Sequence, residues 1–583
     1  MTQRPIFGPL PLSKTRARFH LWAPAARSVD LMLETQALPM TRRNDGWFVL
    51  DADAAAGTLY RFNIDGATLV PDPGSHFQPM DVHGVSELID HDYPWQSTHW
   101  RGRPWHDAVI YELHVGTFGE SGNYEGVIAH LDHLVETGVT AIELMPLSDF
   151  AGSRNWGYDG VLPYAPDSAY GRPDALKALI DAAHGRGLMV LLDVVYNHFG
   201  PDGNYLGLYA PEFFTAEFDT PWGSAIDYRN PSVRNFAVQN ALHWLKTYRF
   251  DGLRLDAVHA IRARGEPSIL DAIALAAAEL AKQEDRHIHL VLENDDNAAD
   301  HLQPQGLYRA QWNDDYHHAW HVLLTGETEG YYEDYVDPIP RLRRALTDGF
   351  IYQGEISRHR GSSQRGQSSK ELPPPAFVNF LQNHDQIGNR PYGERLDSLA
   401  KPEAIEAALA ITLLAPQIPL LFMGEEWGST QPFPFFCDFG GELAIAVEEG
   451  RRREFAAQYR RRKEGSEPPS ALAPETFAQA RLDWSALNRP PHMKRLALVR
   501  RLLDLRRKHV TPLLAAGQPE AAVVRHGPSM LGIDWRWKHS SLRLRANLSS
   551  KPAAHETTEI GAVIWGEPKH GTLAAWQVIW RLE

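Results

Sequence analysis

Cysteine is nearly absent from this chain of 583 residues, in which Cys437 stands alone. A single thiol excludes an intramolecular disulfide and a cysteine-rich zinc site. Long apolar runs are also lacking, and no window approaches the roughly 18 uncharged apolar residues that a membrane-spanning helix needs. The N-terminal segment 1–12 shows neither the apolar stretch nor the cleavage site of a secretory signal. We therefore expect a cytoplasmic protein without a membrane partner.

Positive charge is in short supply as well. The chain has 58 Lys and Arg against 73 Asp and Glu, so its formal net charge is −15 at pH 7. Proteins that bind nucleic acids carry a basic surface that neutralises phosphates, and this balance argues against such a partner. No internal repeat of fixed period is visible, which argues against a solenoid. Nothing in the pattern indicates an oligomeric state.

Aromatic residues, by contrast, are abundant. The chain contains 17 Trp, 20 Tyr and 23 Phe. Most of them are expected to pack in hydrophobic cores. The alternative for some is an open cleft whose flat rings stack on the apolar faces of a ligand.

Three regions differ in their residue pattern. Residues 1–103 alternate short β-like runs with turn signals, which predicts an immunoglobulin-like β-sandwich of the kind found in carbohydrate-binding modules. Residues 104–512 alternate β-branched runs with helical windows, the βα pattern of a parallel sheet. Residues 513–583 return to strand-like alternation, and we expect a C-terminal β-sandwich there.

The middle region predicts a closed (β/α)8 barrel, also called a TIM barrel, with inserted loops. Seven strands are clear and an eighth, near 310–313, is weak. The clear strands are expected at 108–115, 141–145, 188–194, 252–258, 289–293, 377–381 and 419–423. Active sites of such barrels lie at the carboxyl ends of the strands, so the residues at those ends are the first candidates for chemistry.

Acidic and basic side chains gather at these strand ends. Asp256, Glu293 and Asp385 end the fourth, fifth and seventh strands, and two histidines and an arginine accompany them, namely His198, His384 and Arg254. Two carboxylates that face one cleft suit glycoside hydrolysis, in which one acts as the acid and the other attacks the sugar carbon.

The two carboxylates need different environments to divide these roles. Arg254 precedes Asp256 by two positions and shares its face of the strand, so we expect it to keep Asp256 ionised as the nucleophile. Glu293 has no basic residue within three positions. Its pKa should therefore be raised, as a general acid requires.

Four short segments carry a family resemblance. Residues 193–198, 252–256, Glu293 and 380–385 resemble, in order and spacing, the signature regions of the α-amylase family of glycoside hydrolases. The resemblance implies Asp256 as nucleophile, Glu293 as acid/base and Asp385 as the residue that grips the sugar hydroxyls. It also implies that His198, Arg254 and His384 line the subsite of the attacked sugar, and that Tyr158 stacks on that sugar.

Longer stretches resemble one branch of that family, the malto-oligosyltrehalose trehalohydrolases. They are residues 325–332, 352–361, 381–390, 423–427, 432–436 and 449–455. This resemblance implies a retaining hydrolase that cleaves the α-1,4 bond next to the trehalose end of maltooligosyltrehalose and releases trehalose and a maltooligosaccharide. Its partners would be this substrate and related α-glucans. The loops at 325–332, 352–361 and 427–455 follow the last three strands, so we expect them to wall a short pocket over the barrel mouth.

Several alternatives stay open at this point. A glycogen branching enzyme or an isoamylase-type debranching enzyme would carry the same acidic trio, and a non-catalytic glucan-binding protein is the rival from another class. His259 is a candidate contact to the leaving group, although many α-amylases have a Lys-His pair where His259-Ala260 stands. Trp427 is a further candidate sugar contact, with packing as its alternative. Asn197 matches a position that ligates calcium in many α-amylases, but no cage of further ligands is visible, so neither a metal nor an organic cofactor is predicted.

Overall fold

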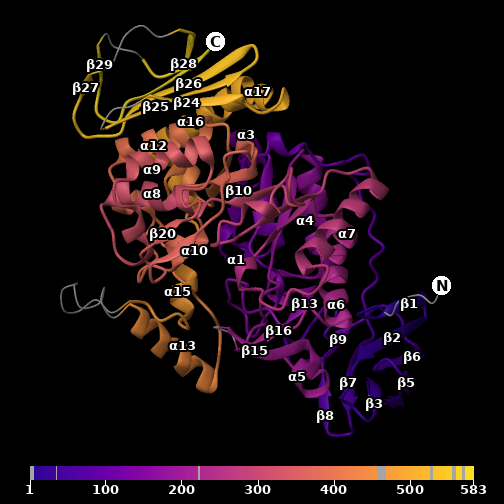
Figure 1. Ribbon diagram of the computed structural model, residues 1–583. Helices are drawn as coiled ribbons and strands as arrows, with labels where there is room; N and C mark the ends of the chain where they lie inside the picture. Colours follow the sequence, from indigo (N-terminus) through magenta and orange to yellow (C-terminus); the bar gives the residue numbers. More distant parts are fainter. Residues whose placement is uncertain are drawn as a thin grey trace.

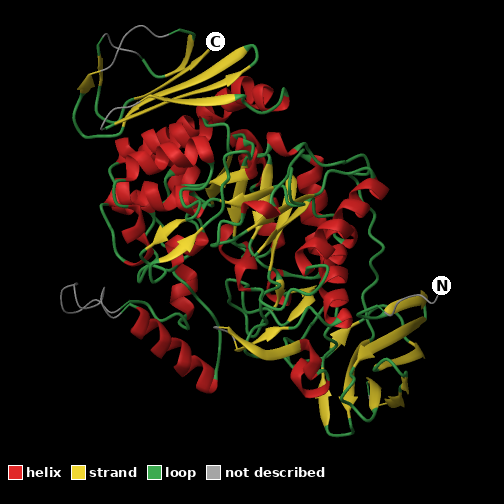
Figure 2. Cartoon of the chain, viewed as in Figure 1, coloured by secondary structure: helices red, strands yellow, loops and turns green. Residues whose placement is uncertain are grey.

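The computed structural model describes residues 6–34, 36–220, 223–455, 468–525, 529–554, 560–567 and 571–583. A closed barrel of eight parallel strands forms the centre, and antiparallel sheets lie at both ends of the molecule (Figure 1). Figure 2 shows the helices gathered around the barrel and the two outer regions built mainly from strands. The predicted fold class is therefore confirmed.

The barrel strands lie where the sequence predicts them, including the weak one. In order around the barrel they are β10 (Ile110–Leu113), β11 (Ala141–Leu144), β14 (Met189–Val194), β17 (Gly252–Leu255), β18 (His289–Leu292), β19 (Ala310–Trp312), β22 (Phe377–Asn379) and β23 (Ile418–Phe422). The ladder between β23 and β10 closes the barrel. All eight strands are buried along their length, as expected for parallel strands covered on both faces.

Helices follow the strands and shield them from solvent. The main ones are α4 (Pro173–Gly185), α6 (Pro231–Leu242), α7 (Ile269–Glu284), α8 (Asp314–Thr325), α9 (Pro338–Asp348), α12 (Pro402–Leu414) and α16 (Pro490–Leu505). Proline opens several of them, at a position where its missing N–H costs no hydrogen bond. Two short helices, α2 (Tyr124–Ile128) and α3 (Leu131–Thr137), follow β10. No helix in the described parts of the chain is both long enough and apolar enough to cross a bilayer.

The N-terminal region consists of two antiparallel sheets. One has the order β1 (Leu10–Ser13), β2 (Arg16–Trp22), β6 (Trp47–Asp53) and β5 (Thr41–Arg42), and the other has the order β4 (Gln36–Pro39), β3 (Val29–Leu33), β7 (Leu59–Ile64) and β8 (Thr68–Val70), with β9 (Ser86–Glu87) also paired to β7. Aromatic rings join these sheets to the barrel. Phe7 contacts Phe236 of α6 at 4.8 Å between ring centroids, and Trp22 contacts Phe213 at 5.5 Å.

The C-terminal region is an antiparallel sheet that packs on the barrel helices. Its order is β24 (Ala521–Arg525), β25 (Met530–Trp537), β26 (Ser540–Asn547), β30 (Val578–Leu582) and β28 (Ala562–Trp565), and a small ladder of β27 (Ala553–Ala554) and β29 (Thr572–Leu573) accompanies it. Trp535 and Trp580 stack on each other, and their indole N–H groups donate to Leu346 of α9 and Ala410 of α12. Both indoles are buried, so they fasten the sheet to these two helices.

Candidate active site

The predicted catalytic acids meet at the carboxyl end of the barrel. Asp256, Glu293 and Asp385 line one cavity of about 670 Å³. The same cavity is lined by the predicted sugar contacts Tyr158, His198, Arg254, His259 and His384. Residues that lie more than 200 positions apart in the chain are therefore neighbours because parallel strands end at a common edge.

Asp256 follows β17 directly, and Arg254 in that strand holds it. One guanidinium nitrogen, Nη1 of Arg254, donates to Asp256 Oδ1 at 2.7 Å and to Asp193 Oδ2 at 2.7 Å. The amide of Asn197 donates to Asp256 Oδ2 at 2.9 Å. Burial favours the neutral acid, but Arg254, His198 and Asn197 together outweigh it and lower the pKa of Asp256. This carboxylate is ionised, as a nucleophile must be.

Glu293 follows β18 and has the opposite electrostatics. Its Oε2 accepts a hydrogen bond of 2.6 Å from the backbone N–H of Ala257. Burial raises the pKa of Glu293 well above its usual range, and the nearby Asp256 adds to that shift. Arg254 opposes it from 3.8 Å. The raised pKa agrees with the sequence-based expectation, but its cause differs. The expectation assumed that no basic residue is near, whereas Arg254 is near and burial outweighs its effect on the pKa.

Asp385 and His384 belong to the short helix α10 (His384–Gly388) beyond β22. Asn389 donates to Asp385 Oδ1 at 2.7 Å. Burial raises the pKa of Asp385 although His384 opposes the shift. His384 is anchored by Glu112 of β10, which accepts from its backbone N–H at 3.1 Å and pairs with its Nδ1. Burial lowers the pKa of His384, but the ion pair with Glu112 outweighs burial and the net pKa is raised.

Tyr158 is held between two neighbours of the acids. Its ring stacks on His384 at 5.1 Å with an interplanar angle of 24°, and its hydroxyl donates to Asp193 Oδ2 at 2.6 Å. The carbonyl oxygen of Tyr158 lies 2.9 Å from His198 Nε2. Burial and the proximity of Asp256 raise the pKa of Asp193 to about 6. Tyr158, His198 and Asp193 thus form a hydrogen-bonded group beside Asp256.

A second, smaller cavity of about 260 Å³ adjoins the first. The two share His259, Glu293, Asp314 and Asp385 as lining residues. The loops expected over the barrel mouth supply Tyr331, Ser357, His359 and Arg360, and residues just beyond their expected bounds, among them Asp334 and Arg365, complete much of the wall. Arg360 is fixed by ion pairs with Asp295 and Asp296, and the backbone N–H of Asp295 donates to His259 Nδ1 at 3.2 Å. Glu293, the predicted acid/base, therefore lies at the junction of the two cavities.

Comparison with known proteins places this geometry in a family. The chain is 42% identical over 518 residues to a malto-oligosyltrehalose trehalohydrolase of Deinococcus radiodurans, across 88% of this chain and 85% of the relative. It is 40% identical over 483 residues to one of Saccharolobus solfataricus, across 81% and 83%. The chain belongs to the malto-oligosyltrehalose trehalohydrolase family.

Wider relationships agree with this trehalohydrolase assignment. The profile of the alpha-amylase catalytic domain matches residues 90–207. A crystal structure from Salmonella typhimurium, described as a candidate alpha amylase, is 44% identical and superposes over 99% of both chains with a TM-score of 0.94. A pullulanase from Paenibacillus barengoltzii is 20% identical with a TM-score of 0.72 over 99% of this chain and 94% of its own, and this likeness concerns the fold alone.

Trp427 differs from the expectation for it. The residue lies in the short helix η9 (Glu425–Trp427) after β23, where its side chain is 1% exposed. Its indole packs on Trp484 at 4.7 Å and on His133 of α3 at 5.6 Å. It does not line either catalytic cavity among the described residues. The prediction of a sugar contact was wrong, because the chain turns at η9 and directs the indole into the core.

The loop 427–455 nevertheless reaches the site through other residues. Phe435, Arg451 and Glu454 line the larger cavity. Arg451 donates to the carbonyl oxygen of Gly388 at 3.0 Å, which fastens α13 (Gly441–Glu454) over the short helix that carries Asp385. Phe433 is fully buried and stacks on Trp156 at 5.5 Å. Of the three phenylalanines between positions 433 and 436, only Phe435 therefore lines the cavity.

Several site residues escaped the sequence-based reasoning. They are Glu112, Asp193, Trp312, Asp314 and Asn389. Trp312 ends β19, and the guanidinium of Arg254 lies 4.1 Å from the centre of its ring, a cation–π contact that helps to orient Arg254. The available signal was position: Glu112, Asp193, Trp312 and Asp314 lie at or just beyond the carboxyl ends of barrel strands. Within the described residues no group of three or more His, Cys, Asp or Glu could hold a metal ion.

Proposed function

We propose that the chain hydrolyses the α-1,4 bond next to the trehalose end of maltooligosyltrehalose, releasing trehalose and a shortened maltooligosaccharide. The activity is that of the family. The mechanism rests on one observation. Arg254 lies beside two acids whose pKa values shift in opposite directions, since the pKa of Asp256 is lowered and that of Glu293 is raised. A nucleophile and a proton donor are the two groups that retaining glycoside hydrolysis requires.

The reaction follows from these two protonation states. Asp256 attacks the anomeric carbon of the glucosyl residue while Glu293 gives its proton to the departing 4-oxygen of trehalose. The first step leaves a covalent glucosyl ester on Asp256 and a carboxylate on Glu293. That carboxylate then takes a proton from water, which attacks the anomeric carbon and breaks its bond to Asp256, so both acids return to their starting states with retention of configuration.

The two cavities suggest where the substrate parts bind. The larger cavity holds Asp256 and the stacked rings of Tyr158 and His384, so it suits the attacked glucosyl residue. The smaller cavity begins at Glu293 and suits the leaving trehalose. Its wall contains Asp314, Asp334 and Arg360, and paired hydroxyls in such a wall reject an ill-fitting glucan more strongly than apolar contacts would.

Product analysis tests this proposal directly. The purified chain is incubated with maltotriosyltrehalose, and the products are separated by anion-exchange chromatography, with the Asp256→Asn variant as the control. We expect trehalose and maltotriose, with the new reducing end released first as the α-anomer in NMR spectra. Transfer products or cleavage of α-1,6 branches would instead indicate a branching or debranching enzyme, and binding without turnover would indicate a glucan-binding protein. A cytoplasmic location is part of the proposal, and fractionation of cells that produce a tagged chain would test it.

A further inference from the structure

A third cavity lies at the opposite end of the barrel from the catalytic acids. Its volume is about 390 Å³, within the range of small-ligand pockets. Residues at or just before the amino ends of the strands line it: Trp105 precedes β10, His289 opens β18, Arg309 precedes β19 and Pro375 precedes β22. Among the described residues, none that lines this cavity also lines the two catalytic cavities.

The charge of this cavity contrasts with the acidic chain around it. Arg309, His106, His287 and His289 line it, and no described Asp or Glu does. Asp107, next to the lining residue His106, faces His106 at 3.5 Å and Arg103 at 3.8 Å, and Asp251 acts on His289 from outside the cavity lining. Arg309 is exposed, and no acidic group among the described residues acts on its charge. The guanidinium therefore offers its donors to the cavity without a compensating carboxylate.

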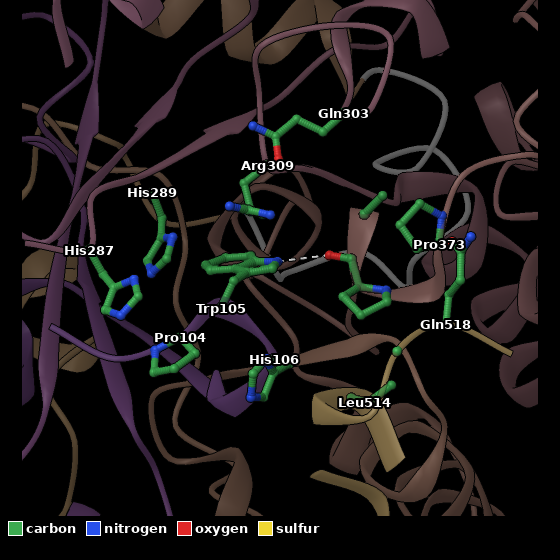
Figure 3. A pocket seen from close by; sticks show the side chains of 13 residues that line it. Pro104, Trp105, His106, His287, His289, Gln303, Arg309, Pro373, Leu514 and Gln518 are labelled. Carbon is green, nitrogen blue, oxygen red and sulfur yellow. Dashed lines mark hydrogen bonds between the residues drawn. The ribbon is translucent and has the colours of Figure 1, made fainter. Parts of the chain in front are cut away.

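The Trp105 side chain lies in the same wall as this arginine and is fixed in place. Trp105 is 5% exposed, and its indole N–H donates to the carbonyl oxygen of Pro375 at 2.8 Å. Figure 3 shows this bond and the side chains of Arg309, His106, His287 and His289 around the indole. His289 packs against Trp105 at 5.1 Å between ring centroids. The ring is thus held in place before any ligand arrives.

One buried polar atom in this wall has no protein partner. His289 is 3% exposed, and its Nε2 lies 2.8 Å from the carbonyl oxygen of Arg103. Its other ring nitrogen, Nδ1, has no hydrogen-bond partner among the described residues. Buried polar atoms in proteins are rarely left unpaired, and an exception asks for an explanation such as an unseen ligand or water.

We propose that this cavity is a second ligand site and that it binds a phosphorylated monosaccharide. The Arg309 fork matches the geometry of a phosphate, with which it forms paired charge-assisted hydrogen bonds. His106 and His287 add N–H donors. Trp105 supplies an apolar part of the wall for a sugar ring, and the amides of Gln303 and Gln518 in the same wall can bond the hydroxyls of that sugar.

Calorimetric titration of the full chain tests the proposal, with glucose 6-phosphate, inorganic phosphate and glucose as separate probes. We expect saturable binding of glucose 6-phosphate, weaker binding of phosphate and none of glucose. Arg309→Gln should weaken glucose 6-phosphate binding at least tenfold, and His287→Gln by a smaller factor. Both side chains are exposed, so the variants should fold, which circular dichroism would verify.

Two controls make the outcome decisive. Arg16→Gln removes the same charge from an exposed position, the first residue of β2 in the N-terminal region. This variant should leave binding unchanged. Asp256→Asn alters the catalytic cavity and should also leave it unchanged, since the two sites lie at opposite ends of the barrel. Equal binding by wild type and Arg309→Gln, or no saturable binding, would overturn the proposal. Phosphate binding as tight as glucose 6-phosphate would overturn the role of the sugar.

Discussion

Arg254 Nη1 donates to Asp256 Oδ1 at 2.7 Å, from two positions earlier in the chain. The pair is nearly dry, with the Arg254 side chain 3% exposed and that of Asp256 14%. A charged hydrogen bond in such surroundings is much stronger than one in water. It keeps the nucleophile ionised and aims one of its oxygens, so the reactivity of Asp256 depends on a neighbour that touches three acids at once.

Asp256→Asn should abolish the covalent step while the cavity keeps its shape. An amide cannot form the glycosyl ester, although its single oxygen can still accept from Arg254, while the bond from Asn197 is lost because the NH2 group only donates. We expect kcat to fall by at least about 10³-fold, with the Kd for substrate within a few-fold of wild type. Single-turnover kinetics and calorimetry on the same preparation measure both quantities. A variant that retains substantial turnover would show that another group is the nucleophile.

The loss of kcat in Glu293→Gln should depend on the leaving group of the substrate. The variant cannot protonate the departing oxygen, so poor leaving groups such as trehalose should suffer most, and an accepted aryl glycoside with an acidic phenol should be partly spared. The slope of log kcat against leaving-group pKa should therefore be steeper in this variant than in Asp256→Asn. If both variants respond alike to leaving-group pKa, the division of roles between Asp256 and Glu293 is wrong.

Two neighbouring phenylalanines form a matched pair for the loop after β23. Phe435 lines the larger cavity and is only partly buried, whereas Phe433 is fully buried against Trp156. Phe435→Ala should raise KM several-fold with little loss of stability. Phe433→Ala should cost about 3–5 kcal/mol of unfolding free energy, as large buried truncations do, with a smaller effect on KM. Urea unfolding and steady-state kinetics on both variants would reveal a reversed pattern if Phe433 were the sugar contact.

Glu143 in β11 gives the fold a pH dependence that the mechanism does not use. It is 1% exposed, and neither carboxyl oxygen has a partner among the described residues. Burial, reinforced by Asp193 and Glu112, raises its pKa well above the usual value. The folded state therefore keeps a proton that the unfolded chain loses above about pH 4.5, so this contribution to stability falls as pH rises from there toward the raised pKa.

Glu143→Gln removes that loss because a neutral amide replaces the protonated acid. The Tm of the variant relative to wild type should increase between pH 4 and pH 8. Glu120→Gln, at an exposed position, is the control and should show a constant difference across this range. Thermal unfolding by circular dichroism at several pH values measures both variants. A constant difference for Glu143→Gln as well would mean that Glu143 is ionised in the folded protein.

The barrel and its acidic trio could be predicted because both are local in the sequence. Asp256 and Glu293 directly follow buried strands, Asp385 lies a few positions beyond another, and a closed parallel sheet brings such positions to one edge. The ion pair of Glu112 and His384 could not be predicted in this way, because 272 positions separate its members and only the closure of the barrel makes them neighbours. The proximity of Arg254 to Glu293 could not be predicted either, because the two residues are far apart along the chain.

The direction of a side chain beyond the end of a strand is the second feature that could not be predicted from the sequence. Trp427 follows an acidic pair beyond β23, as a sugar contact would, but the turn at η9 points its indole at Trp484. Phe433 and Phe435 are two positions apart with the same residue type, and only the fold decides which one meets solvent. The boundaries expected at residues 103/104 and 512/513 stay predictions. The residues that line the cavity at the amino ends of the strands are scattered between positions 104 and 518, so no sequence motif marks this cavity.

The ratio of two specificity constants tests the central claim most directly. kcat/KM is measured on maltotriosyltrehalose and on the plain maltooligosaccharide of equal length, under identical conditions. If the cavity between Glu293 and the loops of Tyr331 and Arg360 is shaped for trehalose, the capped substrate should be favoured at least about 100-fold, a discrimination within reach of paired hydroxyl groups. A ratio near one would contradict the account and leave an enzyme that cleaves α-1,4-glucans without regard to their end.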